Sequence, residues 1–370
     1  MALRESMESD SGLNLALAEA EAVAEEFGLR YVRDRDKGFA RKRRGKGFVY
    51  LDPANEKVTS DQILHRIKTL VIPPAWENVW ICRFGNGHLQ ATGRDQRERK
   101  QYRYHQLWCK VRNETKFAKL SLFGECLPKI RERLAVDVAK NDMSREMVLA
   151  AIVQVMEETM IRIGNDEYAE ENDSYGLTTI RNHHTKVQGS KVHFKFRGKS
   201  GVMREATLED KRLSRIIRKC QDLPGQELFA YECDDGSVRD VGSSDVNSYL
   251  KEITGEPITA KDFRTWGATV HAAEFLYNIG PAESGTKKEF KERECRTVKA
   301  ASEFLGNTVA VCRKYYVHPA IIEADQEGRL VEAFKKSKRK MGSAAGKHLE
   351  HAEFAVLEML KDSDRLSSLI

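Results

Sequence analysis

Residues 192–206 read VHFKFRGKSGVMREA, and this stretch decides the fold class because strand-like sequence interrupts an otherwise helical half of the chain. Every second residue from Val192 to Phe196 is apolar, which is the period of a strand with one buried face. Gly198–Gly201 supplies a turn, and Val202–Ala206 can return as the second strand. The pattern predicts a β-hairpin with Lys199 at its tip.

Helical patterns lie on both sides of this hairpin. Apolar residues recur at helical spacing through Arg145–Ile163, with Ser144 as the predicted N-cap. Thr259 and Asp262 have the spacing of a capping box that opens a helix through about Tyr277. We therefore predict a mainly helical domain over residues 106–370, with a small sheet or hairpin inside it.

The sequence before residue 106 has a different pattern. β-rich runs at 47–52, 79–84 and 88–92 alternate with turn residues, and one short helix is predicted near Ser60–Thr69. Residues 12–28 read as an acidic amphipathic helix. The predicted fold class is α+β, with a helical extension over 1–28, a small β-rich domain over 29–105 and a larger helical domain over 106–370.

Composition limits the compartment and the partners. The net charge of +6 permits a polyanionic partner without requiring one. The seven cysteines are scattered without a C-x-x-C pair, which favours a reducing cytoplasm over a disulfide framework or a zinc site. No apolar run is long enough for a membrane span, and the N-terminus lacks the pattern of a signal peptide. His183 and His184 have no third ligand nearby, so we expect no metal site.

Basic residues gather in two short runs in the β-rich part. Arg41–Lys46 reads RKRRGK, and a second group of cations lies between Arg94 and Arg103. Either run can be a solvated face or a surface that contacts phosphates.

Four local features have the chemistry to bind and attack a phosphate. Arg162 lies in the segment IRIG, Lys199 on the hairpin tip, and Arg264 in KDFRTWG near the start of a capped helix, where backbone donors favour an anion. Asn307 precedes Tyr316 by nine positions in LGNTVAVCRKYYVHP. Taken singly, each of these residues is more often a surface cation or a packing residue.

Together, in this order, these segments resemble the catalytic motifs of type IB DNA topoisomerases of the compact bacterial and poxviral kind. Members carry an arginine in I-R-x-G, a hairpin lysine, an arginine in K-D-x-R-T-x-G, and a histidine or asparagine nine positions before a tyrosine. The resemblance spans roughly residues 30 to 320, and its further segments are GLTTIRN at 176–182, IPPAW at 72–76 and GRDQRERKQY at 93–102.

The resemblance implies an activity and a set of roles. The enzyme would relax supercoiled duplex DNA through a 3′-phosphotyrosyl intermediate, as a monomer that clamps the duplex, without ATP, metal or other cofactor. Tyr316 would be the nucleophile, Arg162 and Arg264 would contact the non-bridging oxygens, Asn307 would donate to the same oxygens, and Lys199 would protonate the leaving 5′-oxygen. In a bacterial cell it would act in the cytoplasm, at the nucleoid. Chemistry alone does not choose between Tyr315 and Tyr316; the family spacing from Asn307 chooses Tyr316.

Five further residues are predicted to contact DNA by the same resemblance. Arg97, Lys100 and Tyr102 lie in the segment of the β-rich domain that faces the duplex in the family, and Tyr168 and Lys261 match contacts made by the catalytic domain. Most contacts would be to the phosphate backbone, so binding should depend strongly on salt.

Two other functions fit part of the pattern. A tyrosine recombinase shares the arginines, the lysine and the tyrosine on a related helical fold, but typically has a helical N-terminal domain. A non-catalytic DNA-binding protein would explain the basic runs but not the ordered set of five catalytic residues.

Overall fold

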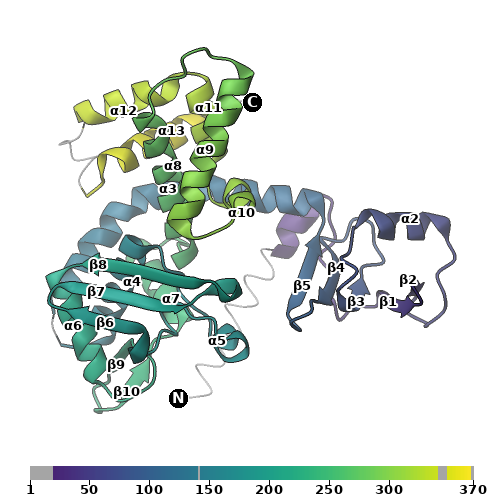
Figure 1. Cartoon of the computed structure of the whole chain (residues 1–370), viewed down its shortest axis with the longest axis horizontal. Helices are drawn as coiled ribbons and strands as arrows, with labels where there is room; N and C mark the ends of the chain where they lie inside the picture. Colours follow the sequence, from purple (N-terminus) through teal and green to yellow (C-terminus); the bar gives the residue numbers. More distant parts are fainter. Residues whose placement is uncertain (1–19, 141, 341–347, 368–370) are drawn as a thin grey trace. The chain divides into compact units, whose positions relative to one another are not determined.

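The computed structural model describes residues 20–140, 142–340 and 348–367, excluding the side chains of 114, 115, 167, 168 and 365–367. The chain forms two compact units, the first ending at Lys116 and the second beginning at Phe117. A long helix, α3 (Gln106–Val138), begins at the predicted domain boundary and continues across the division between the units. The α+β class is confirmed: the first unit is built around a small sheet, and helices dominate the second (Figure 1).

The first unit is built on an antiparallel sheet of five strands in the order β2-β1-β3-β4-β5. Ile67 of helix α2 packs among buried apolar residues of the sheet. The bounds are β1 (Phe39–Arg44), β2 (Gly47–Leu51), α2 (Asp61–Thr69), β3 (Glu77–Ile81), β4 (Leu89–Arg94) and β5 (Lys100–Tyr104). The predicted strand over 79–84 is wrong at its end, because β3 stops at Ile81.

The two basic runs contribute strands that the sequence patterns did not predict, β1 and β5. Each pairs with an apolar or mixed neighbour, β1 with β2 and β5 with β4, so cross-strand pairing overrides the low strand propensity of the cations. Arg41 is not a freely solvated cation. Its guanidinium donates to the carbonyls of Ile72, Pro73 and Trp76, at 3.3, 3.0 and 2.7 Å. One cation of the run therefore holds the IPPAW loop in place.

Residues 20–26 are helical and end in a turn at 27–28. Ala24 and Leu29 pack against Trp108, so the end of the predicted N-terminal helix is anchored on the start of α3. The rest of that predicted helix, before residue 20, lies outside the described residues.

The second unit combines two small sheets with helices. The order of the larger sheet is β6-β7-β8, and a two-stranded sheet pairs β10 with β9. In Figure 1 these sheets and α4–α7 occupy one part of the unit, and α8–α13 the other. The bounds are α4 (Arg145–Thr159), α5 (Asp166–Asn172), η1 (Asn182–His184), β6 (Thr185–Gln188), β7 (Lys191–Arg197), η2 (Lys199–Gly201), β8 (Met203–Glu209), α6 (Lys211–Asp222), β9 (Ala230–Glu232), β10 (Val238–Asp240), α7 (Ser243–Thr254), α8 (Ala260–Asn278), α9 (Lys287–Leu305), α10 (Val309–Tyr315), α11 (Pro319–Gln326), α12 (Arg329–Lys340) and α13 (His351–Ser367).

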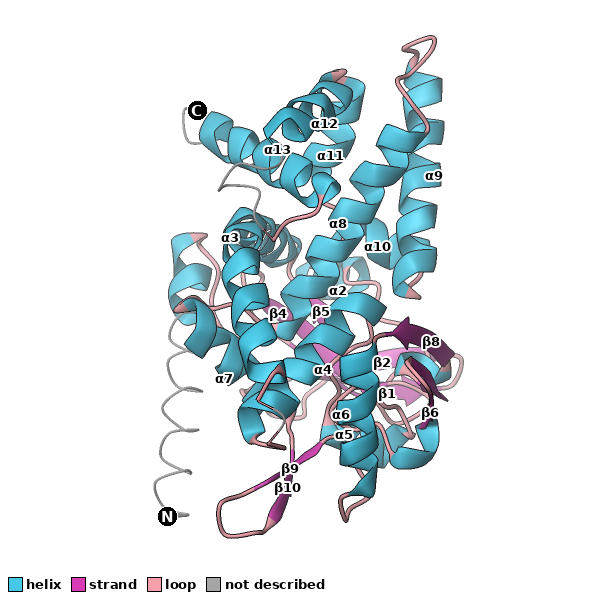
Figure 2. Cartoon of the chain, turned by 90° about the vertical axis from the view of Figure 1, so that its left-hand side faces the viewer, coloured by secondary structure: helices cyan, strands magenta, loops and turns pink. Residues whose placement is uncertain are grey.

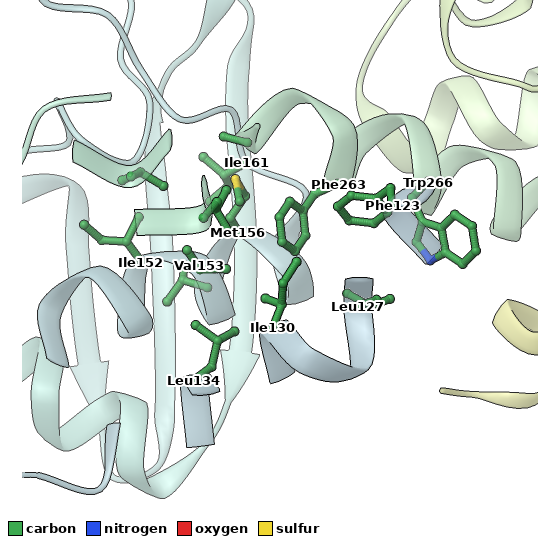
Figure 3. Packing of buried hydrophobic residues seen from close by; sticks show 14 of the residues in the cluster. Phe123, Leu127, Ile130, Leu134, Ile152, Val153, Met156, Ile161, Phe263 and Trp266 are labelled. Carbon is green, nitrogen blue, oxygen red and sulfur yellow. The ribbon is translucent and has the colours of Figure 1, made fainter. Parts of the chain in front are cut away.

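Helix α4 is the centre of this unit's core. Its residues from Met147 to Val153 are all buried, which is typical of a helix covered on every side. Figure 3 shows the packing of α4 with side chains from α3 and α8, and the rings of Phe123 and Phe263 meet edge to face at 4.9 Å. Because α4 is packed on all sides, the position of its C-terminal end is fixed relative to the core.

The predicted helix through Ile163 is too long. Helix α4 ends at Thr159, and Met160 has a left-handed backbone with φ 53°. The Thr159 hydroxyl donates to the Val155 carbonyl at 2.5 Å and accepts from the Ile161 amide at 3.3 Å, which satisfies backbone groups at the helix end. Ser144 does occupy the N-cap position, although its side chain makes no capping hydrogen bond there.

A network of hydrogen bonds and ion pairs links the four helices α3, α4, α8 and α13. Arg131 of α3 pairs with Glu157 of α4 and Glu353 of α13, each at 2.7 Å. Glu353 also accepts from the Trp266 indole of α8, at 3.2 Å. Figure 2 shows α3, α4, α8 and α13 from the side. None of the helices in the described part of the chain is long and apolar enough to cross a membrane.

Candidate active site

The predicted hairpin forms, with Lys199 at its tip. Strands β7 and β8 pair in antiparallel register from Lys191 with Glu209 to Arg197 with Met203. Val192, Phe194 and Phe196 are buried as the alternation predicts. Lys199 is exposed in the turn and lines a pocket together with Arg162 and Arg264. Residues far apart in sequence therefore surround one pocket.

Arg162 lies on the segment that follows α4, beyond the helix end. Its guanidinium donates to the Oδ1 atom of Asn307, from the connection between α9 and α10. Because α4 is fixed by the core, the pair joins a rigid helix exit to the segment that precedes Tyr316.

Arg264 is the most buried of the candidate residues, with 4% of its surface exposed. The capping box that starts its helix is present, since the Thr259 amide donates to Asp262 at 2.8 Å. Arg264 donates to the carbonyls of Met160 and Leu305, the latter at 3.0 Å. Its Nε atom is buried and makes no hydrogen bond within the described residues.

The positive charge of Arg264 is destabilised by its surroundings. Burial, followed by the charge of Arg162, lowers the pKa of Arg264 to about 10, and the neighbouring Tyr316 opposes this shift. A buried cation bonded to neutral carbonyls is poorly compensated. An anion in the pocket would relieve this, which is what a phosphate-binding site requires.

Tyr316 is the residue directly after α10, and its ring lies with its centroid 5.7 Å from the Arg264 guanidinium carbon. The ring packs against a small buried cluster that includes Met160 and Leu305. Its main-chain carbonyl accepts from the Thr269 hydroxyl at 3.0 Å. Both the ring and the backbone of Tyr316 are therefore held in place.

The neighbouring Tyr315 has a different environment. It is 37% exposed, and its ring lies beside the Lys314 ammonium at 5.1 Å. Of the two tyrosines, Tyr316 is the one whose ring lies beside Arg264, and it is the residue that the family spacing from Asn307 selects.

Asn307 has one half of its amide engaged and the other half available. Its Oδ1 atom accepts from Arg162, whereas its Nδ2 atom is buried with no hydrogen-bond partner among the described residues. Its backbone amide donates to Ser302 at 3.0 Å, and Gly306 before it has φ 62° as the C-cap of α9. The Arg162 contact therefore fixes the orientation of the amide.

Sequence reasoning missed one cation in this pocket, Arg204. It lies on β8, lines the same pocket, and its pKa is lowered by burial and then by the charge of Arg162. The alternation of the returning strand puts position 204 on the inward face, which was the available signal. No motif marks it.

The candidate DNA contacts divide between the two units. In the first, Arg97 is exposed in the turn between β4 and β5. Lys100 pairs with Asp34 at 2.6 Å, and Tyr102 is 46% exposed and stacked on Tyr104 at 5.9 Å.

In the second unit, Lys261 is exposed in the first turn of α8. Tyr168 lies on α5, and its side chain is outside the described residues. Lys261 therefore precedes Arg264 by one helical turn, on the same helix.

The histidine pair is part of a 3-10 turn, η1, in which the Nδ1 atom of His184 accepts from the Arg181 amide at 3.1 Å. Burial lowers the pKa of His184 to about 4. Among the described residues, no group of three or more His, Cys, Asp or Glu side chains is placed to hold a metal ion.

Comparisons with known proteins match both parts of the chain. Residues 99–344 match the family model of the eukaryotic DNA topoisomerase I catalytic core, and residues 47–95 match the bacterial DNA topoisomerase IB N-terminal domain. The chain is 31% identical over 294 residues to the DNA topoisomerase 1B of Acanthamoeba polyphaga mimivirus, covering 78% of this chain and 88% of the relative. It is 22% identical over 303 residues to the DNA topoisomerase 1B of vaccinia virus, covering 78% and 89%.

Proposed function

The chain belongs to the type IB DNA topoisomerases, and we propose that it cleaves and reseals one strand of duplex DNA with Tyr316 as its nucleophile. The observation that carries this assignment is the position of the Tyr316 ring over the buried guanidinium of Arg264. The match of the N-terminal residues to a topoisomerase IB domain removes the recombinase alternative.

The cleavage step forms one bond to phosphorus and breaks another. The Tyr316 oxygen attacks the phosphorus, its proton passes to solvent, and the bond to the 5′-oxygen breaks. Arg162 and Arg264 contact the non-bridging oxygens as their charge increases, and the Nδ2 donor of Asn307 binds one of them. Lys199 donates the proton that the 5′-oxygen needs to leave.

Religation is the reverse of this step. The free 5′-hydroxyl attacks the phosphotyrosyl ester and returns a proton to Lys199, and the bond to the Tyr316 oxygen breaks as that oxygen takes back a proton from solvent. Because the phosphotyrosyl ester preserves the energy of the broken phosphodiester bond, resealing needs no ATP. While the strand is open, rotation of the duplex removes supercoils.

The protein would hold its DNA as a monomer, with both units contacting one duplex. Arg97, Lys100 and Tyr102 would bind from the first unit, and Tyr168 and Lys261 from the second. Backbone contacts of this kind give affinity that falls steeply with salt and little sequence preference. All seven cysteines are free thiols, as expected in a reducing cytoplasm, where the enzyme would act on the DNA of the nucleoid.

Plasmid relaxation tests the choice of nucleophile. Wild-type protein should relax supercoiled plasmid in EDTA without ATP and form a covalent complex with DNA when quenched with detergent. Tyr316→Phe should do neither, whereas Tyr315→Phe, the matched control, should do both. A covalent complex formed by Tyr316→Phe would refute the assignment.

A modified substrate tests the role of Lys199. A 5′-bridging phosphorothiolate releases a thiolate, which leaves without being protonated. Lys199→Ala should be slow on ordinary DNA and close to wild type on this substrate. If the defect is equal on both substrates, Lys199 is not the general acid.

A further inference from the structure

Arg204 is a cation in a place where the sheet pattern puts apolar side chains. It pairs across the hairpin with the buried Phe196, and cross-strand partners share a face of the sheet. The alternate residues Ala206 and Leu208 on the same face are partly and fully buried. Arg204 therefore extends from the inner face of the hairpin toward the pocket, a short distance from the Lys199 turn.

The contacts of Arg204 and Arg264 follow one pattern. Arg204 donates through Nη2 to the carbonyls of Thr159 and Phe304, both at 3.4 Å. Arg264 donates to the carbonyls of the next residue in each segment, Met160 and Leu305. Two guanidiniums thus bridge the same two helix ends, at consecutive carbonyls.

Those two segments are the C-terminal ends of α4 and α9, where carbonyls lack helical partners and carry partial negative charge. Arg162 follows the last residue of α4 by three positions, and Asn307 follows the last residue of α9 by two. The contacts of Arg204 therefore join the tip end of the Lys199 hairpin to the helix ends that precede two other candidate catalytic residues.

Gly306 gives the guanidinium of Arg204 its space. A Cβ atom built on Gly306 would lie 2.3 Å from the Nη1 atom of Arg204, and the positive φ of Gly306 also favours glycine. The planar guanidinium lies against the bare backbone of the α9 C-cap. A lysine could contact the two carbonyls through its ammonium, but it lacks the planar guanidinium that lies against Gly306.

We propose that Arg204 is a positioning residue, which sets the reach of Lys199 to the leaving 5′-oxygen by tying the hairpin to the ends of α4 and α9. It acts through Lys199 and does not itself hold the scissile phosphate. This inference rests on the proposed role of Lys199 as the general acid.

Single-turnover cleavage of ordinary and 5′-bridging phosphorothiolate DNA tests the proposal. Arg204→Ala should cleave ordinary DNA 10- to 100-fold more slowly than wild type, which is the loss expected when a proton donor worth about 100-fold or more is misplaced. On the phosphorothiolate its rate should return to within about threefold of wild type, because no proton is needed. A purely structural role would slow both substrates alike.

A double variant supplies the second measurement. If Arg204 acts through Lys199, the variant carrying both Lys199→Ala and Arg204→Ala should cleave no more slowly than Lys199→Ala alone. Arg204→Lys keeps the charge with less disturbance and should show a smaller loss that the phosphorothiolate also removes. Lys195→Ala, from the outward face of the same hairpin, is the matched control and should cleave at the wild-type rate.

The outcomes separate the two proposals. If Lys199→Ala is rescued but Arg204→Ala is not, or if the two losses multiply in the double variant, Arg204 acts independently of Lys199 and the positioning role is refuted. An unchanged rate for Arg204→Ala refutes it too. If Lys199→Ala itself is not rescued, the role proposed for Lys199 fails first.

Discussion

The unpaired amide donor of Asn307 leads to a sharp prediction about the transition state. Its Oδ1 atom accepts from Arg162, and its buried Nδ2 atom has no partner among the described residues. Asn307→Asp keeps the shape and the acceptor for Arg162 but replaces the donor with an oxygen. The substitution therefore removes one hydrogen bond to the phosphoryl group without removing the contact that orients the side chain.

The expected loss is large. Removal of one oxyanion-hole donor costs about 100- to 1000-fold in rate, or roughly 2.7–4 kcal/mol. The new carboxylate at position 307 also repels the phosphoryl oxygens, by about 4 kcal/mol for unit charges at 4 Å in a partly solvated site, and its pairing with Arg162 offsets part of this. Asn307→Asp should therefore lose at least about 1000-fold, and Asn307→Ala about 100- to 1000-fold. Asn307→His retains a donor and should be the fastest variant.

Single-turnover cleavage with enzyme in excess over a duplex oligonucleotide measures this step alone. DNA affinity, measured in parallel by fluorescence anisotropy, should change less than tenfold, because the bond forms mainly in the transition state. Asn278→Asp is a matched control for net charge. It lies exposed at the last residue of α8, about 21 Å along that helix from Arg264, and should cleave normally.

Two results would contradict this reasoning. If Asn307→Asp cleaves within tenfold of wild type, the Nδ2 atom is not a transition-state donor. If affinity for DNA falls as much as the cleavage rate in Asn307→Ala, the side chain binds the ground state equally well.

Two further predictions concern stability, and equilibrium urea unfolding measures both. Arg293 of α9 and Asp325 of α11 form a buried pair at 2.6 Å, with 8% of each side chain exposed. Arg293→Ala should lower the free energy of unfolding by about 3–5 kcal/mol, and a variant with apolar residues at both positions should regain most of this stability. A loss below about 1 kcal/mol would contradict the prediction. Burial lowers the pKa of His318 from 6.5 to about 4. Between these pH values the imidazole binds a proton in the unfolded chain but not in the folded one, so the free energy of unfolding falls as the pH is lowered. The total loss is up to roughly 3 kcal/mol. His318→Asn, which retains a side-chain acceptor for the Ala320 amide, should flatten that acid slope, and an unchanged slope would exclude His318 as its source.

Local sequence patterns were sufficient for much of the candidate site. The alternation around Phe194 predicted the hairpin and placed Lys199 at its tip, because side-chain alternation in a strand is a local property. The capping box of α8 likewise placed Arg264 near a helix start, since capping depends on residues three positions apart. The choice of Tyr316 over Tyr315 came from the resemblance to the family's spacing after Asn307 and not from a local pattern, and in the structure the Tyr316 ring lies beside Arg264.

Tertiary contacts determine how the predicted helices and strands bring the candidate residues together. The sequence extended α4 to Ile163, whereas the helix ends at Thr159, where Arg264 and Arg204 reach the last carbonyls from distant elements. The strand β1 forms from a basic run because β2 and β3 pair with it on both sides. The sequence did not identify Arg204, because the role of an arginine on a predicted strand depends on its tertiary partners, here the carbonyls of Thr159 and Phe304. Hydrogen bonds between segments separated by many residues set these features, and local periodicity carries no information about such partners.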